Sequence, residues 1–345
     1  MSTVAVTGAA GSVGRRVTRL LAERPDVKAI EAIDRVRLMP LQVGGEQKVT
    51  CHQLDVASTA LLDVLDGCDS VVHLADEPGR RSDAELAQRT LSRVLAAAEQ
   101  AGCRHVVLLS SALVYGARPD NPVPITEAYP RRPQPDLAYA RTKAGLEQAA
   151  ERWAAGAGAD LALLRPTTTL SERGVSWIAG ALRAATSLRP EQLDPPVQFL
   201  HHDDLASAVA EVTAQRRSGV YNVAPDGWIG SEAFRTLQAE AELRMPEPIN
   251  DAWVRVARRL RSGAVEPGLD AYVAHPWVVA NDRLRATGWE PAFTNEEAYV
   301  LGTPAPMWRT VAQRRRQELL LGATGTAAAA AMVTAGLVGR RFLRR

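Results

Sequence analysis

A tyrosine and a lysine lie four residues apart in the stretch YARTK. Lysine is rare in this chain, since Lys28, Lys48 and Lys143 are the only ones among 41 lysine and arginine residues. On a helix, residues i and i+4 share one face, so Tyr139 and Lys143 are expected to lie side by side. A phenol, with an ordinary pKa of about 10, is a poor base at neutral pH, but a neighbouring ammonium group favours its ionised form. The pair predicts a tyrosine that exchanges protons with a substrate, and an exposed helical pair is the alternative.

Three glycines follow a short apolar run in VTGAAGSVG near the N-terminus. Gly8, Gly11 and Gly14 have the spacing of a turn from a strand into a helix. Without side chains, such a turn lets a pyrophosphate approach the backbone N–H groups at the start of the helix, here Ser12 and Val13. The motif predicts a dinucleotide site, and a merely tight turn is the alternative.

An acidic residue ends the next strand-like run. Asp34 lies 20 residues after Gly14, where a carboxylate accepts hydrogen bonds from ribose hydroxyls. A carboxylate there repels a 2′-phosphate, so NAD is the expected cofactor, while Arg35 leaves NADP as an alternative. Asp55 and Val56 end the third strand region and are candidates for the adenine pocket, although helix capping also explains Asp55.

A serine follows the fifth strand-like run, in LLSSALVYG. Ser111 is expected at the carboxyl edge of the sheet, where ligands bind in open α/β folds. It is a candidate to bind a substrate hydroxyl and to orient the proton that Tyr139 takes. Serine is also common in turns for purely local reasons.

The elements that must position these residues alternate along the chain. Short β-branched runs and longer helical patterns follow one another, which is typical of βαβ units and a parallel sheet. The expected strands are residues 3–7, 29–34, 49–54, 70–75, 105–110 and 161–165, and the expected helices are 12–24, 58–66, 83–101 and 137–156. This order predicts an α/β fold with a doubly wound parallel sheet, the Rossmann fold. The proline-rich residues 116–135 fit neither pattern, and we expect them to border a site.

Composition limits the classes of function. With 345 residues, 46% of them hydrophobic, the chain can bury a large core. A net charge of +2 without clustered basic residues argues against nucleic-acid binding. Cys51, Cys68 and Cys103 form no CxxC, so neither a disulfide framework nor a metal site is expected, and a reducing cytoplasm fits best. The N-terminus has no basic and apolar leader, so we expect no secretory signal.

Together the motifs resemble the extended short-chain dehydrogenase/reductase family, which includes the NAD-dependent nucleotide-sugar epimerases and dehydratases. The matching stretches are TGAAGSVG, Asp34, VVHLA (71–75), SSALVYG, YARTK, LLRP (163–166), FLHHDDLASAV (199–209), GVYNVAP (219–225) and TGWEP (287–291). They occur in the family's order and cover residues 3–300. The pattern is most similar to UDP-galactose 4-epimerase-like members.

The resemblance implies catalytic roles for Ser111, Tyr139 and Lys143 around a bound NAD, with Tyr139 as acid/base while hydride moves between a sugar carbon and the nicotinamide. The residues expected to contact the cofactor are Gly8, Gly11, Ser12, Val13, Gly14, Asp34, Arg35, Asp55, Val56, Leu74, Ala75, Tyr139, Lys143 and Pro166. A small-molecule substrate, first of all a nucleotide sugar, and a homodimer are also implied.

The resemblance divides the chain into three parts. Residues 1–165 are the expected Rossmann domain, residues 166–304 a substrate-binding lobe interleaved with returning strands, and residues 305–345 a tail. Within the tail, residues 319–339 carry no charge and are long enough to span a bilayer. Their four glycines, three threonines and many alanines insert poorly, so an alanine-rich packing helix or a mobile tail is the alternative to membrane contact. The protein is expected in the cytoplasm, with membrane association through residues 319–339 as an open possibility.

The second half departs from the family pattern. Thr168 stands where many relatives carry asparagine, and the helix at 83–101 lacks the usual asparagine and glycine near its start. Arg183 and Arg189 are candidates to bind a diphosphate, with a solvated face as the alternative. The further expectations are a buried turn at His201 and His202 before a helix at 204, without a metal role, and packing of Trp253, Trp277 and Trp289 in the C-terminal lobe.

Three functions follow from these features. The leading one is an NAD-dependent epimerase or dehydratase of a sugar nucleotide. The second is an NAD(P)-dependent dehydrogenase or reductase of another hydroxylated substrate. The third is a non-catalytic module that binds a dinucleotide for regulation. Catalytic residues in one site favour the first two.

Overall fold

A computed structural model describes residues 1–38, 45–75, 84–171, 174–175, 177–186, 195–239 and 267–303. By its contacts the chain divides into two units, Met1–Thr303 and Pro304–Arg345. Arg189, Trp253 and residues 319–339 lie outside the described residues. No helix within the described ranges is both long and apolar enough to cross a bilayer.

Seven parallel strands form the main sheet, in the order β10-β6-β5-β4-β1-β2-β3. Their bounds are β1 Ser2–Thr7, β2 Val27–Asp34, β3 Val49–Gln53, β4 Ser70–His73, β5 His105–Leu109, β6 Asp160–Pro166 and β10 Gly219–Val223. The expected doubly wound sheet is confirmed. Strand order reverses between β1 and β4, so their carboxyl ends open a crevice at the switch point, where ligands bind in such folds.

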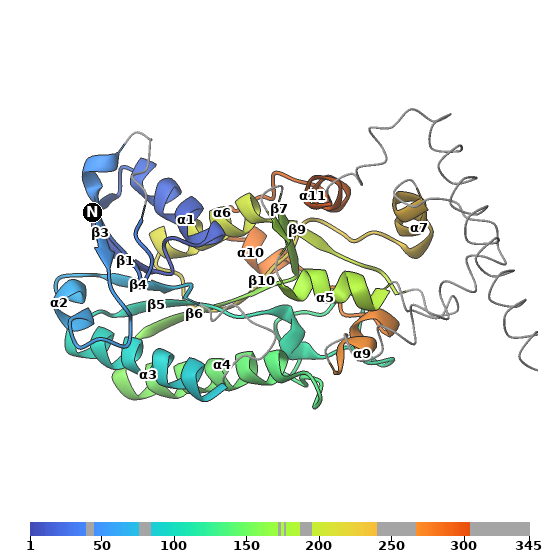
Figure 1. The fold of residues 1–345 in the computed structure, drawn as a ribbon, viewed down its shortest axis with the longest axis horizontal. Coiled ribbons are helices and arrows are strands. Elements are labelled where there is room, and N and C mark those ends of the chain that lie inside the picture. Colours follow the sequence, from blue (N-terminus) through green and yellow to red (C-terminus); the bar gives the residue numbers. More distant parts are fainter. Residues whose placement is uncertain are drawn as a thin grey trace, which may run out of the picture. The chain divides into compact units, whose positions relative to one another are not determined.

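Helices cover both faces of this sheet (Figure 1). α1 (Ser12–Glu23) and α6 (His202–Ala214) pack together on one face, and α3 (Ala84–Gln100) and α4 (Ala138–Ala157) on the other. α2 (Leu61–Leu65) lies beside α3. Each face therefore buries the apolar side of a helix pair.

The alternation of side chains along β1 assigns its residues to the two cores. Val4 and Val6 belong to the apolar cluster that contains Leu21 of α1 and Leu205 of α6. Ala5, between them, belongs to the cluster under α3 and α4. Successive side chains of a strand point to opposite faces, so a sheet buried on both sides reads as a continuous apolar run.

The remaining helices and strands lie between or after the strands of the main sheet in the sequence. A second sheet has the order β8-β7-β9. The bounds are η1 Glu46–Lys48, η2 Ala112–Tyr115, β7 Thr168–Ser171, β8 Gly174–Val175, α5 Trp177–Thr186, β9 Phe199–His201, α7 Ser231–Ala239, α9 Leu269–Ala274, α10 Asp282–Arg285 and α11 Asn295–Gly302.

The start of α6 corrects one expectation. The helix begins at His202 rather than at residue 204, because the His201 ring accepts a hydrogen bond from the Asp203 N–H at 3.2 Å and so caps the helix. Both histidines are buried, as expected. His201 is the N-cap of α6, and His202 is the first residue of the helix.

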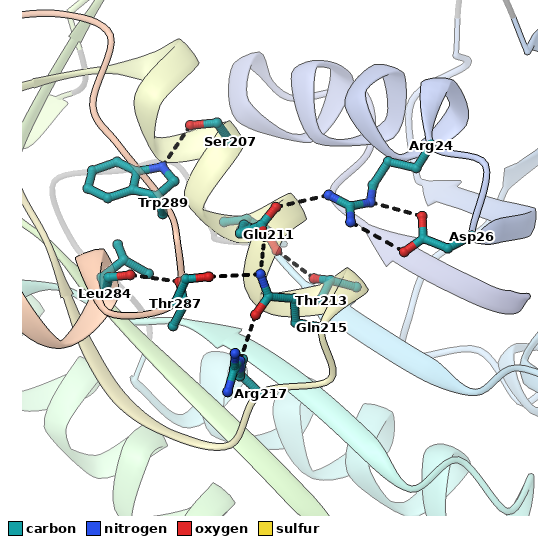
Figure 2. A network of polar contacts seen from close by, with 11 residues as sticks. Arg24, Asp26, Ser207, Glu211, Thr213, Gln215, Arg217, Leu284, Thr287 and Trp289 are labelled. Carbon is teal, nitrogen blue, oxygen red and sulfur yellow. Dashed lines mark hydrogen bonds and ion pairs between the residues drawn. The ribbon is translucent and has the colours of Figure 1, made fainter.

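Polar contacts join α6 and the residue that follows it to Thr287 and Trp289 (Figure 2). The Gln215 side chain donates to the Thr287 carbonyl at 3.0 Å, and the Trp289 ring N–H donates to Ser207 Oγ at 2.9 Å. Trp289 is buried in the core cluster that includes residues of α1 and α6. It therefore packs against the Rossmann core, not against a separate C-terminal lobe as expected.

The proline-rich segment is pinned to neighbouring backbone although it contains no helix or strand. Ile125 forms a bridge with Val279, and the Asn121 amide donates to the carbonyls of Gly116 and Pro276, both at 2.8 Å. The segment connects η2 to α4, and it approaches the cleft described below only through these two elements.

Candidate active site

The glycine turn joins β1 to α1 in a geometry that needs glycine. Gly8 has φ of +75°, and a Cβ there would lie 2.7 Å from the backbone nitrogen of Ala75. A Cβ at Gly14 would overlap the Gly8 carbonyl oxygen. Gly11 is the N-cap of α1, and no side chain caps the helix there. The N–H groups of its first turn are therefore not engaged by a side chain of the N-cap residue, an arrangement that suits the binding of an anion.

Asp34 braces this turn from the end of β2. Its Oδ2 accepts a hydrogen bond from the Ala10 N–H at 2.9 Å, and its Oδ1 accepts one from the Val36 N–H at 3.0 Å. A carboxylate can accept about four hydrogen bonds, so these contacts leave capacity for ribose hydroxyls. The geometry fits the adenosine side of a dinucleotide.

Tyr139 and Lys143 lie in the first turns of α4. Lys143 is buried at 6% exposure, donates from Nζ to the Leu109 carbonyl at 3.2 Å, and places this nitrogen 5.6 Å from the centre of the Tyr139 ring. The Tyr139 ring also meets Trp177 edge to face, with 5.3 Å between centroids. A buried ammonium acts through a lower effective dielectric than an exposed one, which strengthens its field on the phenol.

Ser111 caps η2 and faces the same space. Its Oγ accepts from the Leu113 N–H at 3.3 Å, so the local explanation for a serine here holds. Accepting this bond does not use the hydroxyl proton, which Ser111 can still donate to a ligand.

A cleft of about 250 Å³ brings most of the predicted residues together. The predicted residues that line it are Gly8, Gly11, Ser12, Val13, Gly14, Leu74, Ser111, Tyr139, Lys143 and Pro166. The cleft runs from the glycine turn at the switch point to α4. Residues at or just after the ends of β1, β4, β5 and β6, far apart in the sequence, thus meet at the carboxyl edge of the sheet.

Other predicted residues lie beside or away from the cleft. Ala75 backs the glycine turn, and Arg35 is exposed. Asp55 is exposed and its Oδ1 accepts from the Ala57 N–H at 2.8 Å, so a local turn accounts for it. Val56 is buried in the core under α3. Neither Asp55 nor Val56 lines the cleft, and their place in an adenine pocket stays a prediction.

Several lining residues were not predicted. Thr167, Trp177, His202 and Trp277 all reach the cleft, and so does Thr168, whose departure from the family pattern was noted. Trp277 was expected only to pack a lobe. The signal for His202 was present in FLHHDD, but the pattern did not show which of the two histidines would face inward. Arg183 belongs to α5.

A buried ion pair lies one helical turn beyond Lys143. Glu147 is fully buried and accepts from Arg165 Nε at 2.9 Å and Nη2 at 2.6 Å. Ser110, which lines the cleft, donates to the same carboxylate at 2.5 Å. Burial alone lowers the pKa of Arg165, but the hydrogen bonds and charge of Glu147 raise it above its ordinary value. The Arg165 guanidinium therefore stays charged beneath the cleft.

Tyr115 is a second tyrosine close to these groups. Its hydroxyl donates to Asn222 Oδ1 at 2.7 Å, and the Arg165 guanidinium lies 4.7 Å from its ring centre. Burial raises the pKa of Tyr115 to about 12, in spite of the Arg165 charge. Tyr115 is thus unsuited to proton exchange. Among the described residues, no cluster of three or more His, Cys, Asp or Glu is placed to hold a metal ion.

A doubly wound sheet in which a glycine turn leads into a helix at the switch point, with no side chain capping that helix, is typical of dinucleotide-binding proteins. The chain belongs to the NAD dependent epimerase/dehydratase family, whose model matches residues 4–224. NAD is the cofactor of that family.

The chain is also similar to individual proteins and to solved structures. An uncharacterized protein of Mycobacterium tuberculosis is 25% identical over 311 residues, which cover 86% of this chain and 82% of that protein. The UDP-glucose 4-epimerase of Thermus thermophilus, solved with NAD, has a TM-score of 0.63 at 21% identity, over 87% of this chain and 97% of that one. The dTDP-glucose 4,6-dehydratase of Streptomyces venezuelae has a TM-score of 0.61 at 19% identity, over 90% and 97%. These two structures share the fold of this chain.

Proposed function

We propose that the protein is an NAD-dependent oxidoreductase of the epimerase/dehydratase type that acts on a carbinol carbon of a nucleotide sugar. The observation that carries this proposal is the meeting of Ser111, Tyr139 and Lys143 with the glycine turn in one cleft. The family membership and the nucleotide sugars acted on by its structural neighbours support the substrate class.

NAD fits the residues around the glycine turn. The first turn of α1 would hold its pyrophosphate, and Asp34 would hold its ribose hydroxyls. When bound, NAD would supply the hydride acceptor and donor. Lys143, fixed by the Leu109 carbonyl beside Tyr139, would hold the nicotinamide ribose.

The chain's own residues manage the proton. Ser111 donates a hydrogen bond to the reacting oxygen of the substrate and orients it toward Tyr139. Tyr139 takes the proton of the carbinol hydroxyl as the carbon is oxidised and returns it on reduction. Lys143 stabilises the negative charge that the phenolic oxygen carries before it takes this proton and again after it has returned it. Trp177 fixes the Tyr139 ring from its edge.

A dehydrogenase or reductase of a less polar carbinol is the second candidate. Its support is the wall formed by Trp277, whose ring N–H is already bound to the Tyr272 carbonyl at 2.9 Å. With this N–H engaged, Trp277 lines the cleft as an apolar side chain. An epimerase can hold NAD through every cycle, whereas a dehydrogenase must exchange it, so NAD released on heat denaturation of purified protein separates the two candidates.

The test of the proposal is Tyr139→Phe. We expect this variant to bind NAD like the wild type but to lose about 100-fold or more in turnover of UDP- and dTDP-sugars, since general acid/base catalysis typically contributes that much. Tyr129→Phe is the matched control, because Tyr129 donates to Asn121 at 3.3 Å outside the cleft. Equal turnover of Tyr139→Phe and wild type would rule out the proposed role.

A further inference from the structure

His202 lines the cleft, but the proposed chemistry gives it no role. It is the first residue of α6, 7% exposed, and lines the cleft together with Ser12, the first residue of α1. The Nδ1 atom of His202 and the Oγ atom of Ser12 are 2.9 Å apart, across 190 residues of sequence. The close packing of α1 and α6 brings these two helix starts together (Figure 1).

The neighbours of Ser12 are compatible with a hydrogen bond from its hydroxyl to His202. Arg16 Nη1 donates to both Ser12 Oγ and the Ser12 carbonyl, each at 2.9 Å. Guanidinium cannot accept, so the Ser12 hydroxyl proton stays available for Nδ1 of His202. In the tautomer in which Nδ1 accepts this proton, the N–H of the ring is on Nε2. Asp203, next to His202, holds the Arg16 side chain by an ion pair at Nε.

This arrangement places a side-chain donor beside an anion site. Gly11, Ser12 and Val13 form the N-terminal end of α1, where no side chain caps the helix. Resting on the proposed function, we propose that His202 binds the pyrophosphate of the dinucleotide through its Nε2–H, with Ser12 and Arg16 fixing the ring in the donor tautomer. His202 is thus a cofactor-binding residue contributed by the second half of the chain to a turn that the first half builds.

The competing explanation is that His202 only fastens α6 to α1 through Ser12. Both roles use the same contact, so activity cannot separate them. The two roles predict different effects when the imidazole is removed. If His202 binds the pyrophosphate, its loss weakens the binding of ligands that contain a pyrophosphate. If His202 only joins α6 to α1, its loss lowers the stability of the protein without ligand.

The test measures binding of NAD, ADP-ribose and adenosine by titration calorimetry or ligand-observed NMR, together with thermal unfolding without ligand. For His202→Leu we expect about tenfold weaker binding of NAD and ADP-ribose, the size of one hydrogen bond to a charged group. Adenosine, which has no phosphate, should bind as to the wild type. His202→Gln keeps an N–H donor and should restore affinity to within about threefold. His275→Gln, outside the cleft, is the matched control.

Each outcome decides between the two roles. If the wild type binds no NAD, the proposed function itself fails. If the wild type binds NAD and His202→Leu binds NAD and ADP-ribose equally well, the inference is overturned and the proposed function stands. The inference is also overturned if His202→Gln is as weak as His202→Leu, or if adenosine affinity and thermal stability fall in parallel with NAD affinity.

Discussion

Two tyrosines near the cleft differ in what surrounds their hydroxyl groups. Tyr115 is fully buried and bound to Asn222, and burial raises its pKa to about 12. Tyr139 is half-buried, lines the cleft and lies beside the Lys143 ammonium. The four-residue spacing predicted that Tyr139 and Lys143 lie side by side, and the structure shows this contact within one helix. The place of Asp55 in an adenine pocket stays a prediction, since a strand-end aspartate serves a turn and a ligand equally well.

His105 gives the fold a dependence on pH at the scale of one residue. Its Nε2 donates to the Arg217 carbonyl at 2.9 Å, and its Nδ1 accepts from Ser70 Oγ at 3.0 Å, so the ring is neutral and fully buried. Burial is the main cause that lowers the pKa of His105 below its ordinary 6.5, and the charge of Arg216 adds to it.

The lowered pKa predicts a loss of stability in mild acid. As pH falls through 6.5, the unfolded chain binds a proton at this histidine while the folded chain does not, so the free energy of unfolding decreases by up to about 1.4 kcal/mol per pH unit. This contribution is fully present above pH 6.5. Between pH 5 and 6.5, we expect the free energy of unfolding of His105→Gln, measured with urea, to change less with pH than that of the wild type. His275→Gln should show the same pH dependence as the wild type. An equal pH dependence in all three proteins would contradict the prediction.

At the scale of elements, the Glu147–Arg165 pair joins α4 to β6 beneath the cleft. Both side chains are buried, and Arg131 Nη1 adds a contact to Glu147 at 3.0 Å. Removal of one partner of a buried pair leaves the other charge uncompensated. We therefore expect Glu147→Gln to lower the free energy of unfolding by about 3–5 kcal/mol.

Glu151, one turn further along α4, provides the matched control for this prediction. It also pairs with Arg131, at 2.8 Å, but is 39% exposed. An exposed pair contributes about 0–1 kcal/mol, so Glu151→Gln should change the free energy of unfolding by no more than that. Denaturant unfolding measures both variants. If the free energy of unfolding falls equally in the two variants, the buried pair stabilises the fold no more than the exposed one, and the prediction is wrong.

The elements of the first half were predictable because their signals are local. Each strand of the main sheet up to β6 matches an apolar run to within a few residues, since strands buried on both faces need such runs. The beginning of α6 was placed two residues late, because a histidine ring replaces the usual N-cap residue. The short sheet of β7, β8 and β9 gave no comparable pattern, since strands of two to four residues are too short for periodicity.

At the scale of the molecule, one part of the site could be predicted from the sequence and the other could not. The glycine turn and the Tyr139–Lys143 pair are each defined within a few residues of sequence. The cleft wall from Trp177, His202 and Trp277 depends on how later elements pack onto the first half. A single sequence does not reveal such contacts, of which the one between Ser12 and His202 spans 190 residues. The homodimer, which the resemblance implied, stays a prediction that size-exclusion chromatography with light scattering can check.

The last helix of the first unit marks where the chain can be cut. α11 begins with a capping box between Thr294 and Glu297, and its Tyr299 packs against Phe199 and Phe234 with ring centroids 4.9 and 5.3 Å apart. A chain ending at residue 303 keeps these contacts, whereas one ending at residue 293 loses them. Removal of a buried aromatic side chain costs about 3–5 kcal/mol.

We therefore expect the chain of residues 1–303 to bind NAD and to unfold at the same denaturant concentration as residues 1–345, and residues 1–293 to unfold at a much lower one. The same pair of longer chains tests the membrane contact predicted for residues 319–339, because a span needs an uncharged segment of that length. If the full chain sediments with membranes and residues 1–303 stay in the supernatant, the tail carries the contact. If both sediment alike, the contact belongs to the first unit and the prediction for the tail is wrong.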